Sequence, residues 1–176
     1  MKGGINVKTF LEEQLAHEPT KEWLDIIGKY AKLSRYKWAL NIGTASGLSA
    51  WAIATNGTGK VITVDIKTSS MPMALAYEYD YEDRLIDMNM SSKRYMEGNE
   101  VDFDLIIIDG SHEYEDVLSD LENSWKWITD DGYIVCDDYA NPRFGPGIKR
   151  AISAFVDGKD VRTKVESGKM IIYKPR

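Results

Sequence analysis

Two short apolar segments of this chain end abruptly in acidic residues, and these acids are the side chains best placed to do chemistry. Residues 105–108 and 133–136 are continuous apolar runs, typical of strands buried on both faces, and each is followed directly by an aspartate. In open α/β sheets, ligands bind just beyond the carboxyl ends of such strands. We therefore expect four side chains to gather at one sheet edge: Asp109, Asp137, Asp138 and the nearby His112.

That group of side chains suggests a cation with a base beside it. Three carboxylates at one edge repel each other unless protons, cations or helix N-termini compensate their charge. Oxygen ligands suit Mg²⁺, and a neutral imidazole such as that of His112 can remove a proton from a substrate hydroxyl. The plainer alternatives are that His112 packs at the start of the following helix and that the carboxylates cap helices or face solvent.

A glycine-containing turn follows an earlier predicted strand. Gly43 and Gly47 let the backbone approach a ligand closely, and the next helix offers free N–H groups. The G-x-x-x-G spacing differs from a dinucleotide fingerprint, and no Gly-Lys-Ser/Thr follows as in a P-loop. Asp65 ends the next strand about 20 residues later, where an acid accepts hydrogen bonds from ribose hydroxyls. A tight turn without a ligand and an exposed strand-end Asp are the alternatives.

The composition indicates an ordinary globular chain. Its 176 residues, with 43% hydrophobic residues, suit a single domain over residues 1–176, with a helical cap over residues 1–35. A net charge of −6 provides no basic surface for nucleic acid, and we expect no membrane segment. The single Cys136 lies in a predicted strand and forms no internal disulfide, which suits a reducing, cytoplasmic location.

Strand-like and helix-like segments alternate through most of the chain. Such alternation predicts a parallel sheet, and the last two strands, joined by a short turn, add an antiparallel hairpin. The predicted helices are 7–16, 20–33, 48–55, 72–80, 91–97, 113–128 and 146–156. The predicted strands are 38–42, 61–65, 84–88, 104–109, 133–137, 161–165 and 170–173.

Four segments, in this order and spacing, carry a family resemblance. They are residues 41–49, 64–65, 103–114 and 132–139. Together they resemble a class I S-adenosylmethionine-dependent methyltransferase, in the branch of the catechol O-methyltransferases and the metal-dependent sugar O-methyltransferases of macrolide biosynthesis. The resemblance implies a Rossmann-like three-layer α/β/α sandwich with a mostly parallel seven-stranded sheet and an antiparallel C-terminal hairpin. It extends over about residues 38–174.

The resemblance also implies a role for each matching residue. The glycines pass under the amino-acid part of S-adenosylmethionine, Ser49 contacts its carboxylate, Asp65 binds its ribose and Ser91 lies near its adenine. The implied metal ligands for Mg²⁺ or another divalent cation are Asp109, Asp137 and Asp138, and His112 matches the catalytic base. The full cofactor-binding set is Asn41, Gly43, Thr44, Gly47, Ser49, Asp65, Ile66, Ser91 and Asp109.

The implied function is metal-assisted methyl transfer to a hydroxyl of a small molecule, sugar-like or catechol-like. Asn41 stands where the family usually has Glu or Asp, which implies one weaker cofactor contact. The alternative is a catalytically weak cofactor-binding module or a partner subunit of a larger complex. A phospho-accepting signalling domain fits neither the glycine turn nor the closing hairpin. A homo-oligomer is left open.

Overall fold

A seven-stranded sheet forms the centre of the protein, and its strands lie in the order β3-β2-β1-β4-β5-β7-β6. The structure is a computed structural model that describes residues 6–67 and 69–176; residues 1–5 of the predicted N-terminal cap lie outside this part. The strands from β3 to β5 run parallel, whereas β7 pairs antiparallel with both β5 and β6. Their bounds are β1 Trp38–Ile42, β2 Lys60–Asp65, β3 Leu85–Asn89, β4 Phe103–Ile108, β5 Ile128–Cys136, β6 Arg162–Glu166 and β7 Lys169–Tyr173.

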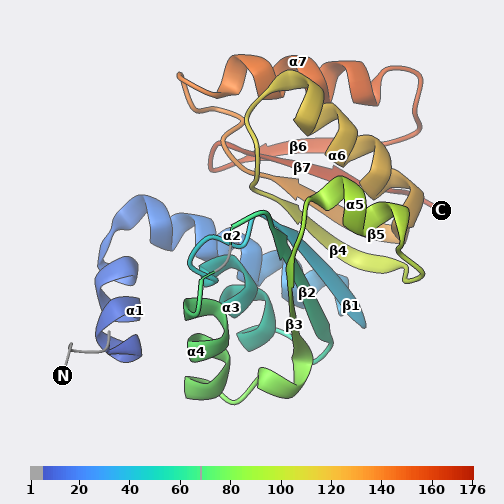
Figure 1. Cartoon of the computed structure of the whole chain (residues 1–176). Helices are drawn as coiled ribbons and strands as arrows, with labels where there is room; N and C mark the ends of the chain where they lie inside the picture. The colour runs from blue at the N-terminus through green and yellow to red at the C-terminus, as the bar shows by residue number, and fades with distance from the viewer. Residues whose placement is uncertain (1–5, 68) are drawn as a thin grey trace.

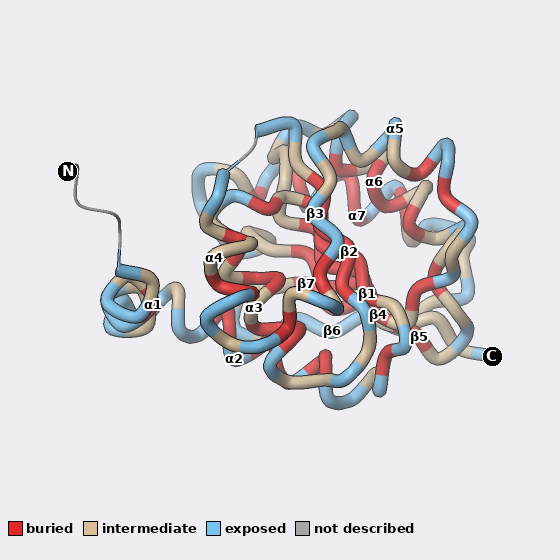
Figure 2. Tube along the Cα trace, turned by 60° about the horizontal axis from the view of Figure 1, so that its bottom comes forward, coloured by how far each residue is buried: buried red, intermediate tan, exposed pale blue. Residues whose placement is uncertain are grey.

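Helices cover both faces of this sheet and complete a three-layer sandwich (Figure 1). Helices α2, α3 and α4 lie on one face, and α5, α6 and α7 lie on the other (Figure 1). α1 projects beside α4, away from the sheet (Figures 1 and 2). The bounds are α1 Val7–Ala16, α2 Glu18–Ser34, α3 Leu48–Thr55, α4 Met71–Glu78, α5 Ser92–Glu97, α6 Tyr114–Trp127 and α7 Gly145–Val156.

Each face of the sheet has its own hydrophobic core because alternate strand residues point to opposite sides. In β4, Leu105 and Ile107 pack with α2 and α3, whereas Ile106 and Ile108 pack with α6 and α7. Figure 2 shows the buried residues concentrated along the strands. The central strands are therefore buried on both sides, as their unbroken apolar runs predicted, and Cys136 is buried with them.

The predicted fold class is confirmed, and the differences concern element boundaries. β5 begins at Ile128, five positions before the predicted start, and the residue predicted as the end of a helix belongs to this strand. The register of β4 against β5 also shifts in this added part. Arg84 lies in a short 3₁₀ helix, Glu82–Arg84, before β3 rather than in the strand. Its guanidinium donates to the carbonyls of Gly57 and Ala54.

None of the helices in residues 6–67 and 69–176 is both long enough and apolar enough to cross a membrane.

Candidate functional site at the carboxyl ends of the strands

The register of the sheet brings the predicted acidic residues to one edge. Ile42 of β1 pairs with Val64 on one side and with Ile108 on the other, and Ile108 pairs with Cys136. The residues that follow these positions therefore lie side by side. Strand order reverses between β1 and β4, and such a switch point opens a crevice where ligands bind in open α/β sheets.

A cavity of about 860 Å³ lies at this switch point. Five of the predicted cofactor-binding residues line it: Gly43, Asp65, Ile66, Ser91 and Asp109. The remaining wall comes from the turns after β1, β2, β3 and β4 and from one side of α6. The structure thus brings together residues from four strand ends around one space large enough for a small organic ligand.

The glycine turn is shaped by its neighbours. Gly43 has φ +94°, and a Cβ there would lie 1.9 Å from the carbonyl oxygen of Asp109. Gly47 has φ +84°, and its Cβ would lie 2.7 Å from the Cα of Pro72. Both positions therefore require glycine for backbone packing, whether or not a ligand is bound. Gly43 also exposes backbone on the cavity wall, where a ligand can approach it closely.

Asp65 is held in place by the backbone around it. Its carboxylate accepts hydrogen bonds from the N–H of Ala45 at 3.0 Å and from the N–H of Lys67 at 2.9 Å. An ionised carboxylate has about four lone-pair sites, so two further acceptor sites remain for a ligand. The side chain lies on the cavity wall, where hydroxyl groups of a ligand could donate to it.

Four predicted cofactor-binding residues do not line this cavity: Asn41, Thr44, Gly47 and Ser49. Asn41 is fully buried, and its amide donates to the carbonyl of Gly43 at 3.0 Å and to the Thr63 hydroxyl at 2.9 Å. Thr44 shares a hydrogen bond with the same hydroxyl at 2.7 Å. These hydrogen bonds support the turn from behind, and the predicted contact of Asn41 and Thr44 with the cofactor stays a prediction.

His112 lies at the other end of the site and is fixed on two sides. Its Nε2 is 2.8 Å from Oδ2 of Asp138, and its ring stacks on Phe144 with 4.1 Å between ring centroids. The other oxygen of Asp138 accepts from the Asn141 amide at 2.9 Å. Base, carboxylate and amide form a chain that orients the imidazole, an arrangement that suits a general base.

The three carboxylates predicted to bind a metal each already face a donor of the protein. The Trp23 indole donates to Oδ2 of Asp109 at 3.2 Å, and the Lys169 ammonium forms an ion pair with Asp137. Asp138 contacts His112, as described above. Burial and the neighbouring charges of Asp137 and Asp138 raise the pKa of Asp109 well above its usual range.

These contacts do not fit a magnesium site. Within the described ranges, no group of three or more His, Cys, Asp or Glu side chains is arranged to hold a metal ion. The predicted magnesium site at Asp109, Asp137 and Asp138 is therefore not confirmed and stays a prediction. Two of the carboxylates pair with a cationic or indole donor, and the third orients His112. Spacing along the sequence gave the location of these acids but not their partners.

Three residues of the site were missed by the sequence reasoning: Trp23, Lys169 and Asp120. Trp23 shows the helical spacing of core residues, so its indole contact has no sequence signature. Lys169 starts β7, and antiparallel pairing of β7 with β5 would have placed it beside Asp137. Asp120 is buried on α6 against the cavity and accepts from the Ser92 hydroxyl at 2.5 Å. Its position among the apolar residues of a helix was the available signal.

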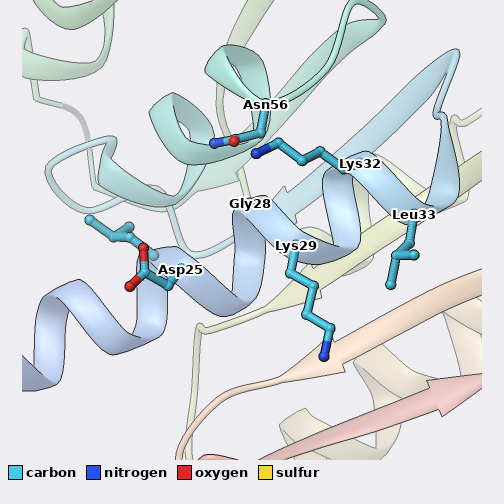
Figure 3. Close-up of a pocket in the computed structure, with 7 residues that line it drawn as sticks. Asp25, Gly28, Lys29, Lys32, Leu33 and Asn56 are labelled. Atoms are coloured by element: carbon cyan, nitrogen blue, oxygen red, sulfur yellow. The ribbon is translucent and has the colours of Figure 1, made fainter.

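A second hollow lies on a different part of the protein, between α2 and the end of α3 (Figure 3). Its volume is about 420 Å³, and no strand end contributes to it. Lys32 extends toward Asn56 across it, whereas Lys29 points away, toward the hairpin, where it pairs with Glu166 (Figure 3). None of the predicted site residues lines this hollow, so the strand-end cavity is the candidate site.

Comparisons with known proteins agree with this placement. Residues 40–139 match the family described as a methyltransferase domain. An uncharacterised protein of Acanthamoeba polyphaga mimivirus is 34% identical over 71 residues, which cover 40% of this chain and 29% of that protein. The match thus spans less than a third of that relative's length.

Two solved structures share the fold at low sequence identity. The O-methyltransferase TomG from Streptomyces achromogenes, involved in tomaymycin synthesis and solved with S-adenosylmethionine, has a TM-score of 0.75 at 13% identity, with 99% of this chain and 92% of that chain covered. An O-methyltransferase from Bacillus cereus, solved with S-adenosylhomocysteine, has a TM-score of 0.73 at 17% identity, with 96% and 90% covered. The resemblance found in the sequence motifs is confirmed, and the chain belongs to the methyltransferase domain family.

Proposed function

We propose that this protein transfers a methyl group from S-adenosylmethionine to a hydroxyl of a small molecule, with His112 as the general base. The observation that carries the proposal is the oriented pair of His112 and Asp138, 2.8 Å apart, beside the strand-end cavity of a methyltransferase-family chain. The O-methyltransferases named above share the fold, which supports oxygen as the accepting atom.

The cavity gives the cofactor a consistent orientation. Asp65 would accept hydrogen bonds from the two ribose hydroxyls, since its carboxylate is preoriented by two backbone N–H groups. The backbone at Gly43 would lie against the amino-acid part, and Ser91 would lie toward the adenine. The sulfonium methyl would then point along the row of strand ends, toward Asp109 and His112. Asp109, Gly110 and Ser111 line both the cavity and the small space beside His112, so the two share a wall.

The chemistry requires one proton transfer and one displacement. An ionised Asp138 can only accept, so it holds the Nε2–H of His112 and leaves Nδ1 with a free lone pair. That nitrogen takes the hydroxyl proton while the oxygen attacks the methyl carbon. The new C–O bond forms as the C–S bond breaks, giving a methyl ether and S-adenosylhomocysteine, and the proton later leaves His112 for water. Positioning of the reactants supplies much of the acceleration.

No step of this mechanism passes through a metal, because the carboxylates do not fit one as they are arranged. The proposed acceptor class, a sugar-like or catechol-like hydroxyl compound, comes from the motif resemblance. The stacked ring of Phe144 beside His112 offers an apolar surface against which the acceptor could lie.

Methyl-labelled S-adenosylmethionine, incubated with the chelator-treated protein and a panel of hydroxylated small molecules, tests the proposal. We expect label on an oxygen of at least one compound, with an equal amount of S-adenosylhomocysteine. Cofactor binding without transfer to any compound would favour the alternative, a catalytically weak cofactor-binding module. Label transferred only to nitrogen or carbon acceptors would contradict O-methylation.

A further inference from the structure

The hairpin of β6 and β7 brings a lysine to the acceptor end of the site. A two-residue turn, Ser167 and Gly168, joins the strands with φ of +46° and +77°, as in the turns that match strand twist. Because Met170 lies opposite Cys136 at the end of β5, Lys169 lies beside Asp137. The turn is also tied to the loop after β5, since the N–H of Ala140 donates to the Gly168 carbonyl at 2.9 Å.

The ammonium of Lys169 is enclosed at this position. It pairs with Asp137 and lies 5.1 Å from the centroid of the Trp23 ring. Its side chain is only 16% exposed, compared with 63% for Lys164, which lies on the neighbouring strand of the same hairpin. An ion pair of low exposure is much less screened by water and salt than a surface pair.

Lys169 also connects two of the three carboxylates at the acceptor end, Asp137 and Asp109. Its ammonium contacts Asp137 directly, and the ring that it faces belongs to Trp23, whose indole N–H donates to Asp109 at 3.2 Å. Trp23 comes from α2, Asp109 from the end of β4 and Lys169 from β7. Three distant segments therefore meet around one positive charge at an edge where acidic side chains gather.

We propose that Lys169 is the resident cation of the acceptor end: its ammonium occupies the place beside Asp137 that a divalent metal would need, and it makes the site independent of added metal. This inference rests on the proposed function, which identifies the region around His112 and Asp137 as the place where the acceptor binds. Lys169 is a positioning residue that fixes Asp137 and, through Trp23, Asp109. A tethered ammonium is present in every molecule, whereas a metal must be bound from solution.

A direct metal titration tests this without an acceptor. Mn²⁺ and Mg²⁺ are titrated into the wild type, Lys169→Gln and the matched control Lys164→Gln, with Mn²⁺ binding followed by electron paramagnetic resonance and Mg²⁺ binding by calorimetry. We expect no saturable site in the wild type or the control at submillimolar metal. We expect Lys169→Gln to bind Mn²⁺ at least about tenfold more tightly, because removing the ammonium leaves an uncompensated carboxylate cluster. Lys169→Arg, which keeps the charge, should behave like the wild type.

Two results overturn the inference. The first is tight, saturable metal binding by the wild type; the second is absence of binding by both wild type and Lys169→Gln, since the lysine would then not be what excludes the metal. If Lys169→Gln does not fold, Lys169→Met replaces it in the titration. The melting temperature of the wild type is also measured with and without 1 mM Mn²⁺, a concentration about a thousandfold above a micromolar Kd. A rise of the wild-type melting temperature with Mn²⁺ counts against the inference. A separate titration with S-adenosylmethionine shows whether the proposed function itself fails, because cofactor binding does not depend on the outcome of the metal titration.

Discussion

The two ends of the site are built in different ways. The cofactor end is made mainly by backbone: a turn with two required glycines, and an aspartate held by the N–H groups of Ala45 and Lys67. The acceptor end is made by side chains that meet across the chain. Trp23 and Asp109 are 86 positions apart, and Lys169 and Asp137 are 32 positions apart.

This difference determines what a sequence can reveal. A backbone-made site leaves a local pattern, because glycine is needed wherever φ is positive and space is short. A side-chain-made site leaves no local pattern, because its partners come from elements that only the fold brings together. The comparison predicts that changes at the acceptor end act on turnover, whereas changes at the cofactor end act on folding or on cofactor affinity.

The largest expected effect is at the acceptor end. His112→Ala should lower kcat by about 10²–10⁴ and leave the Kd for S-adenosylmethionine within a few-fold, because it removes only the proton acceptor. Single-turnover kinetics with an identified acceptor measure this. His17→Ala, at an exposed histidine between α1 and α2, is the control and should leave turnover unchanged. An inactive His17 variant, or a fully active His112 variant, would contradict the assignment of His112 as the general base.

A change at Gly43 tests whether the backbone-made end is structural. A Cβ at this position would lie 1.9 Å from the Asp109 carbonyl oxygen, and φ is +94°. Gly43→Ala should therefore lower the free energy of unfolding by more than about 2 kcal/mol, through strain and displacement of β1 from β4. Urea unfolding provides the measurement, with Gly98→Ala, where the nearest atom lies 3.9 Å away, as the control. Equal stability of the two variants would show that the turn can adapt.

Asp120 is the exception at the cofactor end, since it is a buried side chain held by another side chain. Burial raises its pKa to about 6. Because the folded protein holds this proton more tightly than the unfolded chain does, the contribution of Asp120 to the free energy of unfolding is greatest below the unfolded pKa of about 4. That contribution decreases as the pH rises from about 4 to about 6 and is constant above that. Asp120→Asn should therefore be more stable than the wild type by about 2 kcal/mol at pH 8 and nearly equal to it at pH 4.

Denaturant unfolding across that pH range measures the effect of Asp120→Asn. Glu115→Gln, at an exposed acid in the first turn of α6, should leave the pH profile nearly unchanged. If the wild type and Asp120→Asn keep parallel profiles from pH 4 to pH 8, then Asp120 is not the source of the pH dependence.

The smallest effect is expected for the ribose contact. Asp65→Asn keeps the shape but removes the charge, so the affinity for S-adenosylmethionine should fall by about tenfold with little change in stability. Asp83→Asn, at an exposed acid in the 3₁₀ helix before β3, is the matched control. A tenfold loss of affinity in the control, or no loss of affinity in Asp65→Asn, would show that another residue binds the ribose.

The sequence predicted the fold and the strand-end location of the site well. The unbroken apolar runs at Leu105–Ile108 and Tyr133–Cys136 are strands buried on both faces, and the alternation of elements is that of a doubly wound sheet with a closing hairpin. The early start of β5 was missed, because its added residues include Asp130, Asp131 and Gly132, which resemble a turn.

The roles of the individual site residues were harder to predict. Asn41 was expected to touch the cofactor; in the structure it is fully buried and its amide donates to the Gly43 carbonyl, so that contact stays a prediction. The three carboxylates were expected to share a metal. Whether an acid binds a metal or a neighbouring lysine depends on which side chains the fold brings within reach, and Lys169 is distant in the sequence.

Calorimetric titration of the wild type with S-adenosylmethionine tests the central claim most directly, since that claim is that the strand-end cavity is a cofactor site. We predict binding at one site per chain, weakened about tenfold by Asp65→Asn and unaffected by a chelator. The absence of saturable binding to a folded wild-type protein, or binding that is equally strong in the Asp65 variant, would contradict the account.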